Sequence, residues 1–172
     1  MKGNNEILEV IKKRRSIRKF EVDKDIHIEI IESIISAGSF APSGHNNQPW
    51  RFAIIKDRAL KLKISELSAY GSIIKSANTL IAVFFHHPDS YDRDKDLMAI
   101  GACIQNMLLY ITSLGLGAVW LGEILKNKEK VRELLSIPPE DELMAVIALG
   151  YPAFIPKPTS RKSVEELIIN VY

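Results

Sequence analysis

The sequence predicts one domain in which helices cover a central β-sheet. The chain has 172 residues, a length typical of a single domain with a sizeable hydrophobic core. Short apolar runs rich in Val, Ile and Phe alternate with segments whose apolar residues recur at helical spacing, a pattern typical of helices packed on one sheet. No internal repeat or linker divides residues 1–172, so we expect them to form a single domain.

The N-terminal half is predicted to contain two helices, a loop, a strand and a further helical stretch. Apolar residues three and four positions apart indicate the helices, and Gly38 marks the end of the second one. The loop consists of turn-forming residues, and the strand after it is rich in Phe and Ile. In chain order these elements span residues 5–14, 26–38, 39–50, 51–57 and 57–77.

The C-terminal half is predicted to alternate strands with helices. TLIAVFFHH has the continuous apolar character of a buried strand, and Asp94 or Asp96 is expected to cap the long helix that follows. Asn127 is expected to cap a later helix, and Ser163 and Glu166 have the spacing of a capping box. From the buried strand to the last core strand, the elements span residues 79–87, 94–114, 114–122, 127–138 and 142–152.

Composition argues against a membrane protein and against a disulfide scaffold. The uncharged stretch 97–122 is long enough to span a bilayer, but Gln105, Asn106 and the glycines near its end favour a buried helix, a turn and a strand. The first residues lack the apolar region and cleavage site of a secretory signal. The single cysteine, Cys103, excludes a disulfide within the chain. We therefore expect a cytoplasmic protein without a membrane partner.

Basic residues are concentrated in KKRRSIRK, residues 12–19, although the whole chain is nearly neutral. Lys and Arg number 23, Asp and Glu 21, and the net charge is +2, which argues against a nucleic-acid partner. Arg14, Ser16 and Arg18 alternate after a predicted helix end, so an extended backbone would turn all three side chains to one side. Together with residues 159–162 they could bind a phosphate monoester. A solvated basic face would explain the same pattern.

Sequence motifs of the common catalytic classes do not occur. The chain contains no GxSxG, CxxC, HExxH, GxxxxGK[ST] or GxGxxG motif. His86 and His87 are adjacent, but no Cys, Asp or Glu at ligand spacing accompanies them, so no metal site is predicted. If the protein is an enzyme, a bound cofactor is expected to carry the chemistry.

Four segments in order resemble the nitroreductase family of FMN flavoproteins. They are RRSIRKF, APSGHNNQPWRFAII, AIGACIQNMLLYITSLGLGAVWLGEI, and ALGYP with the basic tail KPTSRKSVEEL. The resemblance extends over nearly the whole chain. It implies an α+β fold with a central, mostly antiparallel sheet flanked by helices. It also implies a homodimer whose C-terminal extension crosses onto the partner, so that ELIINVY would be a swapped strand.

The resemblance further implies which residues bind FMN at the dimer interface. Arg14, Ser16 and Arg161 match contacts to the phosphate and ribityl chain, and Arg15 adds a backbone contact. Arg18 matches the basic residue near flavin N1, where a fixed cation would stabilise the negative charge of the reduced ring.

Two further segments are implied to approach the flavin ring. The backbone of Leu121 and Gly122 matches the stretch beside N5, where a glycine permits close approach. Glu123 is not included, because larger members have Glu and Gly in the reverse order. The stretch Gln48-Pro49-Trp50 has a second interpretation with equal weight: it could be a loop-to-strand junction in which Trp50 belongs to the core. The loop residues that match contacts from the other subunit are Pro42, Ser43, Gly44, Asn46 and Gln48.

The resemblance implies an oxidoreductase that passes hydride from NAD(P)H through flavin N5 to a flat electrophilic acceptor, such as a nitroaromatic or a quinone. The cycle would be ping-pong, with no catalytic side chain and no metal. Residues 57–78 are short for the family, so the pocket is expected to be more open or differently covered. Alternatives are a dehalogenase, an azoline or ene oxidoreductase of the same fold, or a flavin storage or sensor module without efficient turnover.

Overall fold

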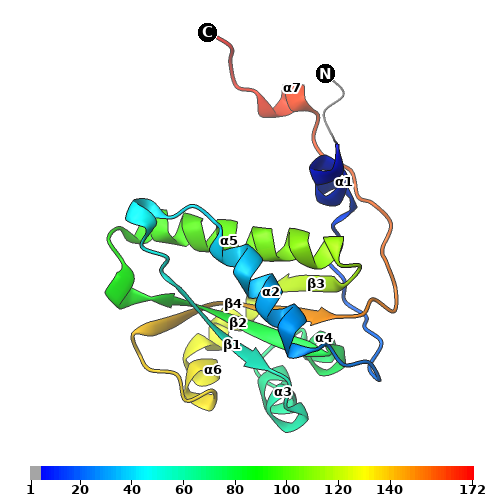
Figure 1. Cartoon of the computed structure of the whole chain (residues 1–172), viewed down its shortest axis with the longest axis vertical. Coiled ribbons are helices and arrows are strands. Elements are labelled where there is room, and N and C mark those ends of the chain that lie inside the picture. Colours follow the sequence, from blue (N-terminus) through cyan, green and yellow to red (C-terminus); the bar gives the residue numbers. More distant parts are fainter. Residues whose placement is uncertain (1–4) are drawn as a thin grey trace.

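A four-stranded antiparallel sheet forms the centre of the computed structural model, which describes residues 5–172 (Figure 1). The strand order is β1-β2-β4-β3, so β2 and β4 are central and β1 and β3 form the edges. The α+β fold with an antiparallel sheet is as predicted. The strands are β1 (Trp50–Ile55), β2 (Thr79–His86), β3 (Gly117–Leu121) and β4 (Asp141–Gly150).

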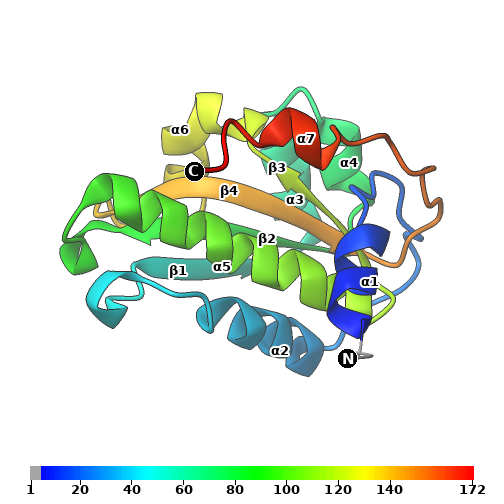
Figure 2. The same ribbon diagram turned by 90° about the horizontal axis from the view of Figure 1, so that it is seen from above.

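Helices cover both faces of this sheet. α2 (Ile28–Ser39) and α5 (Arg93–Ser113) lie on one face (Figures 1 and 2). α3 (Arg58–Ser65), α4 (Gly71–Ser76) and α6 (Lys128–Leu134) lie on the other face. Each face has its own cluster of buried apolar side chains, and the two clusters are separated by the sheet. Alternation along the strands directs neighbouring residues into different clusters.

The two terminal helices stand outside this layered body (Figure 1). Neither α1 (Glu6–Lys13) nor α7 (Val164–Leu167) contains a buried residue. The tail beyond α7, residues 168–172, is exposed and adopts no regular structure in the single chain. Its pairing as a strand with a partner subunit therefore stays a prediction.

The start of α5 differs from the prediction. Asp92 is its N-cap, and the Asp92 carboxylate accepts a hydrogen bond from Lys95 N at 3.1 Å. The prediction that Asp94 or Asp96 caps this helix is wrong, because the helix begins at Arg93. Asp96 lies in the first turn and is fully buried. No helix of the described residues is long and apolar enough to cross a membrane.

The two other predicted caps have different outcomes. Asn127 occupies the N-cap position of α6 as predicted, but its side chain does not cap the helix. Its amide instead donates to Leu67 O at 2.8 Å, which ties α6 to the segment after α3. Ser163 and Glu166 form the predicted capping box at the start of α7.

Candidate functional site

The segment after α1 runs along the free edge of β3. Ser16 forms an isolated parallel β-bridge with Ala118, and Ile17 N donates to Ala118 O at 2.9 Å. Ile17 is 5% exposed and packs in the core on the α3, α4 and α6 side of the sheet. Because side chains alternate along an extended chain, Arg14, Ser16 and Arg18 are directed away from that core.

The C-terminal tail completes a pocket around these side chains. Residues 156–161 lie against them and enclose a cavity of about 200 Å³, which we call the cationic pocket. Arg161 Nη1 donates to Thr159 Oγ1 at 2.8 Å, which orients the Arg161 side chain. The cationic pocket is lined by Arg14, Arg15, Ser16, Arg18, Pro156, Lys157, Thr159 and Arg161. The structure thus brings all five residues expected at the phosphate and N1 end of FMN to one place.

Positive charge dominates the lining of this pocket. No arginine that lines it forms an ion pair with a carboxylate of residues 5–172. Partial burial and the neighbouring charges of Arg161 and Arg15 hold the pKa of the Arg14 guanidinium below its usual value. An anion bound between these groups would relieve that repulsion. The pocket therefore has the electrostatics of an anion site.

Arg15 has an additional structural role. Its Nη1 donates to Lys12 O and to Arg14 O, at the C-terminal end of α1. These carbonyls have no partner inside the helix, so the guanidinium caps α1. The expected backbone contact of Arg15 with FMN is compatible with this side-chain position and stays a prediction.

The end of β3 presents backbone to the outside of the molecule. Leu121 as a whole residue is 3% exposed and packs in the core, whereas Gly122 is exposed; the expected backbone contact of Leu121 with FMN stays a prediction. Gly122 has φ −89°, which any residue can adopt. A Cβ built on Gly122 would meet no atom of the described residues 5–172 within 4 Å. No contact within the described part of the chain requires glycine here, whereas a flat ligand lying against this backbone would.

Glu123 is held away from this open backbone. Its carboxylate accepts from Ser68 Oγ at 2.8 Å and from Ala69 N at 3.0 Å. The Ser68 hydrogen bond and Lys126 lower the pKa of Glu123 below its usual range. Glu123 therefore fastens the segment between α3 and α4 beside β3.

The loop Pro42–Gln48 lies far from the cationic pocket. It packs beside the first half of α5, where a cavity of about 280 Å³ is lined by Pro42, Ser43 and Gly44 together with residues 95–102. The segment that carries Arg14 lies near the other end of α5 (Figures 1 and 2). A helix of this length extends about 30 Å, so one chain does not bring the two predicted parts of the site together.

The loop has an unusual backbone. His45, Asn46 and Gln48 have positive φ angles of 52°, 57° and 48°, a region that costs a residue other than glycine about 1 kcal/mol or more. A Cβ at Gly44 would collide with the ring of Tyr91. Gln48 itself is exposed, and its N donates to Ser43 Oγ at 3.1 Å. This strained shape is held by hydrogen bonds within the loop and by contacts with residues outside it.

A buried carboxylate holds the loop to α5. Asn47 Nδ2 donates to Asp96 Oδ1 at 2.7 Å, and Ser90 Oγ donates to Asp96 Oδ2 at 2.8 Å. The backbone N–H groups of Tyr91 and Asp92 also donate to Asp96 Oδ2. Burial of this carboxylate works against its charge, but the hydrogen bonds prevail and lower the pKa of Asp96. Sequence reasoning assigned Asp96 only a helix-capping role, because its partners come from distant positions.

Comparison with known proteins identifies the family. The nitroreductase family model matches residues 11–72 and 68–151. A protein of Archaeoglobus fulgidus, provisionally named NADH dehydrogenase/NAD(P)H nitroreductase, is 38% identical over 150 residues, which cover 86% of each chain. This chain belongs to the nitroreductase family. The family predicted from the four sequence segments is confirmed.

Two further relatives of this nitroreductase-family chain carry the names of different activities. The crystal structure of a provisionally named nitroreductase from Desulfovibrio desulfuricans, in complex with FMN, has a TM-score of 0.92 and 38% identity and covers 98% of both chains. An iodotyrosine deiodinase of Thermotoga neapolitana is 30% identical over 171 residues and covers 85% of this chain and 88% of its own.

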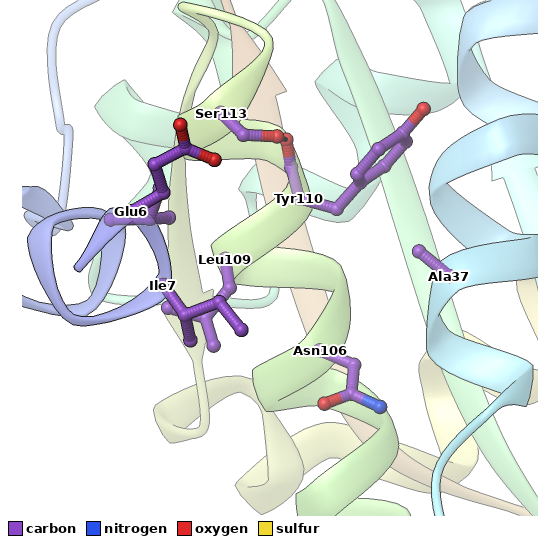
Figure 3. Close-up of a pocket in the computed structure, with 8 residues that line it drawn as sticks. Glu6, Ile7, Ala37, Asn106, Leu109, Tyr110 and Ser113 are labelled. Atoms are coloured by element: carbon purple, nitrogen blue, oxygen red, sulfur yellow. Dashed lines mark hydrogen bonds between the residues drawn. The ribbon is translucent and has the colours of Figure 1, made fainter. Parts of the chain in front are cut away.

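This member of the nitroreductase family also has an apolar hollow beside α1. The hollow measures about 330 Å³ and lies between α1, α2 and α5 (Figure 3). Ile7 of α1 and Leu109 of α5 lie next to each other on one side of it (Figure 3). Ile7 is 75% exposed. The hollow has an apolar lining and no charged cluster, so it suits contact with protein better than with an anion.

The remaining reactive side chains have structural roles. Burial raises the pKa of the Cys103 thiol to about 12, so it is not a thiolate nucleophile. His86 Nδ1 lies 2.7 Å from Asp141 Oδ1, which pairs the ends of β2 and β4. Within residues 5–172 no group of three or more His, Cys, Asp or Glu is arranged to hold a metal ion. Trp50 is 5% exposed and belongs to the core, as one of the two interpretations expected.

Proposed function

We propose that this chain is an FMN-dependent oxidoreductase that uses NAD(P)H to reduce a flat electrophilic acceptor, a nitroaromatic or a quinone, in a ping-pong cycle. The observation that carries the proposal is the cationic pocket, whose arginines have no carboxylate partner among residues 5–172, on the same sheet edge as the exposed backbone of Gly122. Residues 1–172 would act as one FMN-binding domain. When bound, FMN would supply hydride transfer at N5.

The residues of the cationic pocket fit the phosphate of FMN. Arg14 and Arg161 offer guanidinium forks that bind phosphate oxygens through paired hydrogen bonds, and the Ser16 hydroxyl is a further donor. A phosphate dianion would also offset the burial and the repulsion from Arg161 and Arg15 that lower the pKa of Arg14. Arg18 comes next along the same edge and would place a positive charge beside the ring.

The chain itself contributes orientation and electrostatic stabilisation. The guanidinium groups and Ser16 would hold one end of the cofactor, and the backbone of Leu121 and Gly122 would border the other end. The fixed positive charge of Arg18 would favour the reduced, negatively charged form of the ring, and the proposal assigns no step to a catalytic side chain or a metal.

A second copy of the chain would complete the site. The loop Pro42–Gln48 is far from the cationic pocket of its own chain, but a two-fold axis would bring the loop of one subunit to the pocket of the other. The exposed apolar residues of α1 and the apolar hollow beside α1 would be covered in such a dimer. The tail beyond α7 would pair with a sheet edge of the partner. We propose a cytoplasmic homodimer without a nucleic-acid or membrane partner.

The first experiment is to purify the chain and measure its visible spectrum, its mass in solution and the flavin released on denaturation. We expect a yellow dimer with about one FMN per chain. NAD(P)H oxidation is then followed with and without nitroaromatic and quinone acceptors. Failure to bind added FMN would refute the proposal. FMN binding at full stoichiometry without acceptor-dependent turnover would instead indicate a storage or sensor module.

A second candidate activity is reductive dehalogenation. The observation that favours it is the 30% identity with the iodotyrosine deiodinase of Thermotoga neapolitana. In this reaction two electrons from the reduced cofactor and a proton replace a carbon–halogen bond by a carbon–hydrogen bond, and halide leaves. Halide release from a halogenated tyrosine under anaerobic conditions, compared with nitroaromatic reduction by the same preparation, distinguishes the two activities.

A further inference from the structure

We propose that Trp120 contacts the cofactor: its indole forms part of the surface against which the flavin ring lies. This inference rests on the proposed function, and it concerns a residue that was not among those predicted from the sequence. Four observations support it: the exposure of the indole, the sheet face to which it is directed, its register with the cationic pocket and the open backbone beside it.

The two tryptophans of the chain differ in burial. Trp50 is 5% exposed, whereas Trp120 is 42% exposed although it lies on a strand whose other residues are all buried. An indole has a large apolar surface, and its exposure is therefore unfavourable unless another molecule covers it. Nothing in the described chain covers Trp120 in this way.

Trp120 is directed to the same side of the sheet as the side chains of the cationic pocket. Val119 and Leu121 belong to the core on the α3, α4 and α6 side, as does Ile17. Ala118 belongs to the core on the α5 side. Because side chains alternate along extended chains, Trp120 shares the face of Ala118, and Ser16 and Arg18 are directed to the side opposite Ile17.

The register places the indole of Trp120 between Ser16 of the cationic pocket and the exposed backbone of Gly122. Ser16 forms a parallel β-bridge with Ala118. Arg18 and Trp120 each come two residues later, so they occupy corresponding positions on the two adjacent segments. Trp120 is two residues beyond Ala118, a distance of about 7 Å along a strand, and Gly122 is two residues further. A flat ring joined to a phosphate at Ser16 would thus meet a cation, an indole and a backbone without Cβ in succession.

The test uses the emission of bound FMN and its dissociation constant in the full-length protein. An indole in contact with a flavin quenches its fluorescence by electron transfer, so we expect FMN bound to the wild type to emit weakly. Trp120→Phe should raise this emission several-fold. Trp50→Phe is the matched control, because it removes the buried indole, and it should leave the emission of bound FMN unchanged.

Affinity supplies the second measurement. Trp120→Ala should weaken FMN binding about tenfold, as expected for loss of one aromatic stacking partner, whereas Trp120→Phe should retain the wild-type constant within about threefold. The exposed position of Trp120 means that both variants should fold, which circular dichroism and the mass in solution will verify.

The outcomes separate this inference from the proposed function. If the wild type binds no FMN, both fail. If the wild type binds FMN, but Trp120→Phe and Trp120→Ala change neither emission nor affinity, the inference alone is overturned. If Trp120→Ala disrupts the dimer while the remaining dimer binds FMN with unchanged emission and affinity, the indole is a subunit contact and the inference is likewise overturned.

Discussion

Two clusters of positive charge in this molecule differ in what lies at their centre. Around Glu142, Arg93 Nη1 donates to the carboxylate at 2.8 Å and Lys128 Nζ at 2.7 Å, and these cations lower the pKa of Glu142 to about 2. Around Arg14, partial burial and then the charges of Arg161 and Arg15 lower the pKa of Arg14 itself. In the first cluster a carboxylate of the chain pairs with the cations, whereas in the second no carboxylate of residues 5–172 does so, and we propose that an anion from outside takes that place.

The comparison shows why a count of basic residues does not locate a binding site. The cationic pocket draws on one dense run of the sequence and on the distant tail. The Glu142 cluster is assembled from α5, β4 and the start of α6 and has no sequence signature. A ligand site differs from a structural ion pair in whether a carboxylate of the chain lies beside the cations. Substitutions in each cluster can test this difference.

The largest expected effect is on FMN affinity when the arginines of the cationic pocket are removed. The double substitution Arg14→Ala and Arg161→Ala should weaken FMN binding on the order of 10³-fold, because two charge-assisted contacts are lost. Released flavin and titration calorimetry measure it. Lys12→Ala is the control, since Lys12 is exposed and pairs with Glu9 at 3.8 Å. Loss of polyanion binding with FMN retained at full stoichiometry would contradict the assignment.

The Glu142 cluster should respond in the opposite way. Glu142→Gln should lower the free energy of unfolding by about 2 kcal/mol, after allowance for screening of the exposed cations, and should leave FMN affinity unchanged. Denaturant titration of the holoprotein and the apoprotein measures the change. Glu140→Gln, on the exposed turn before β4, is the matched control and should have little effect.

The same cluster gives the stability a pH dependence of known sign. The folded pKa of Glu142, about 2, lies below its ordinary value of 4.5. Its contribution is therefore complete above the ordinary value and disappears as the pH falls through the folded value. The free energy of unfolding should fall more steeply across this interval in the wild type than in Glu142→Gln. Parallel curves would show that the cations do not stabilise the folded carboxylate.

A smaller effect is expected at the buried carboxylate that holds the loop Pro42–Gln48. Asp96→Asn should cost about 1–2 kcal/mol of stability, because an amide cannot accept all the hydrogen bonds made to Asp96. Hydrogen exchange should increase in the loop and in residues 89–92. Asp94→Asn, on the exposed face of the same helical turn, is the control. An unchanged loop in Asp96→Asn would show that Asp96 does not hold its shape.

The smallest effect on the fold is expected at Gly122. Gly122→Ala should raise the stability of the apoprotein by about 0.5 kcal/mol, because the unfolded chain loses freedom and the new methyl group meets no atom of the described residues. FMN affinity should fall, since the methyl group would project toward the proposed ring position. Thermal unfolding and FMN titration give the two values. A stabilised apoprotein with unchanged FMN affinity would contradict the close approach of the ring to this backbone.

Local patterns predicted most of the secondary structure. The isoleucine spacing predicted α2 and the apolar run predicted β2. Both patterns depend only on neighbours in the chain, so tertiary packing did not change the outcome. The Ser163 capping box is equally local. Asp96 was assigned the wrong role, because its hydrogen-bond donors include Asn47, which tertiary folding brings to it. The sequence did not single out Trp120. The pattern of a strand does not show which of its side chains the packed helices leave exposed.

The sequence by itself determined the family, the order of the elements and the alternation of Arg14, Ser16 and Arg18, because each depends on residue types at short, fixed spacings. Only the tertiary structure decided that Arg161 joins these side chains, that no described carboxylate pairs with them and that the loop Pro42–Gln48 lies elsewhere. Burial and electrostatic interaction act through space, so their outcome depends on which distant segments the packed sheet and helices bring together.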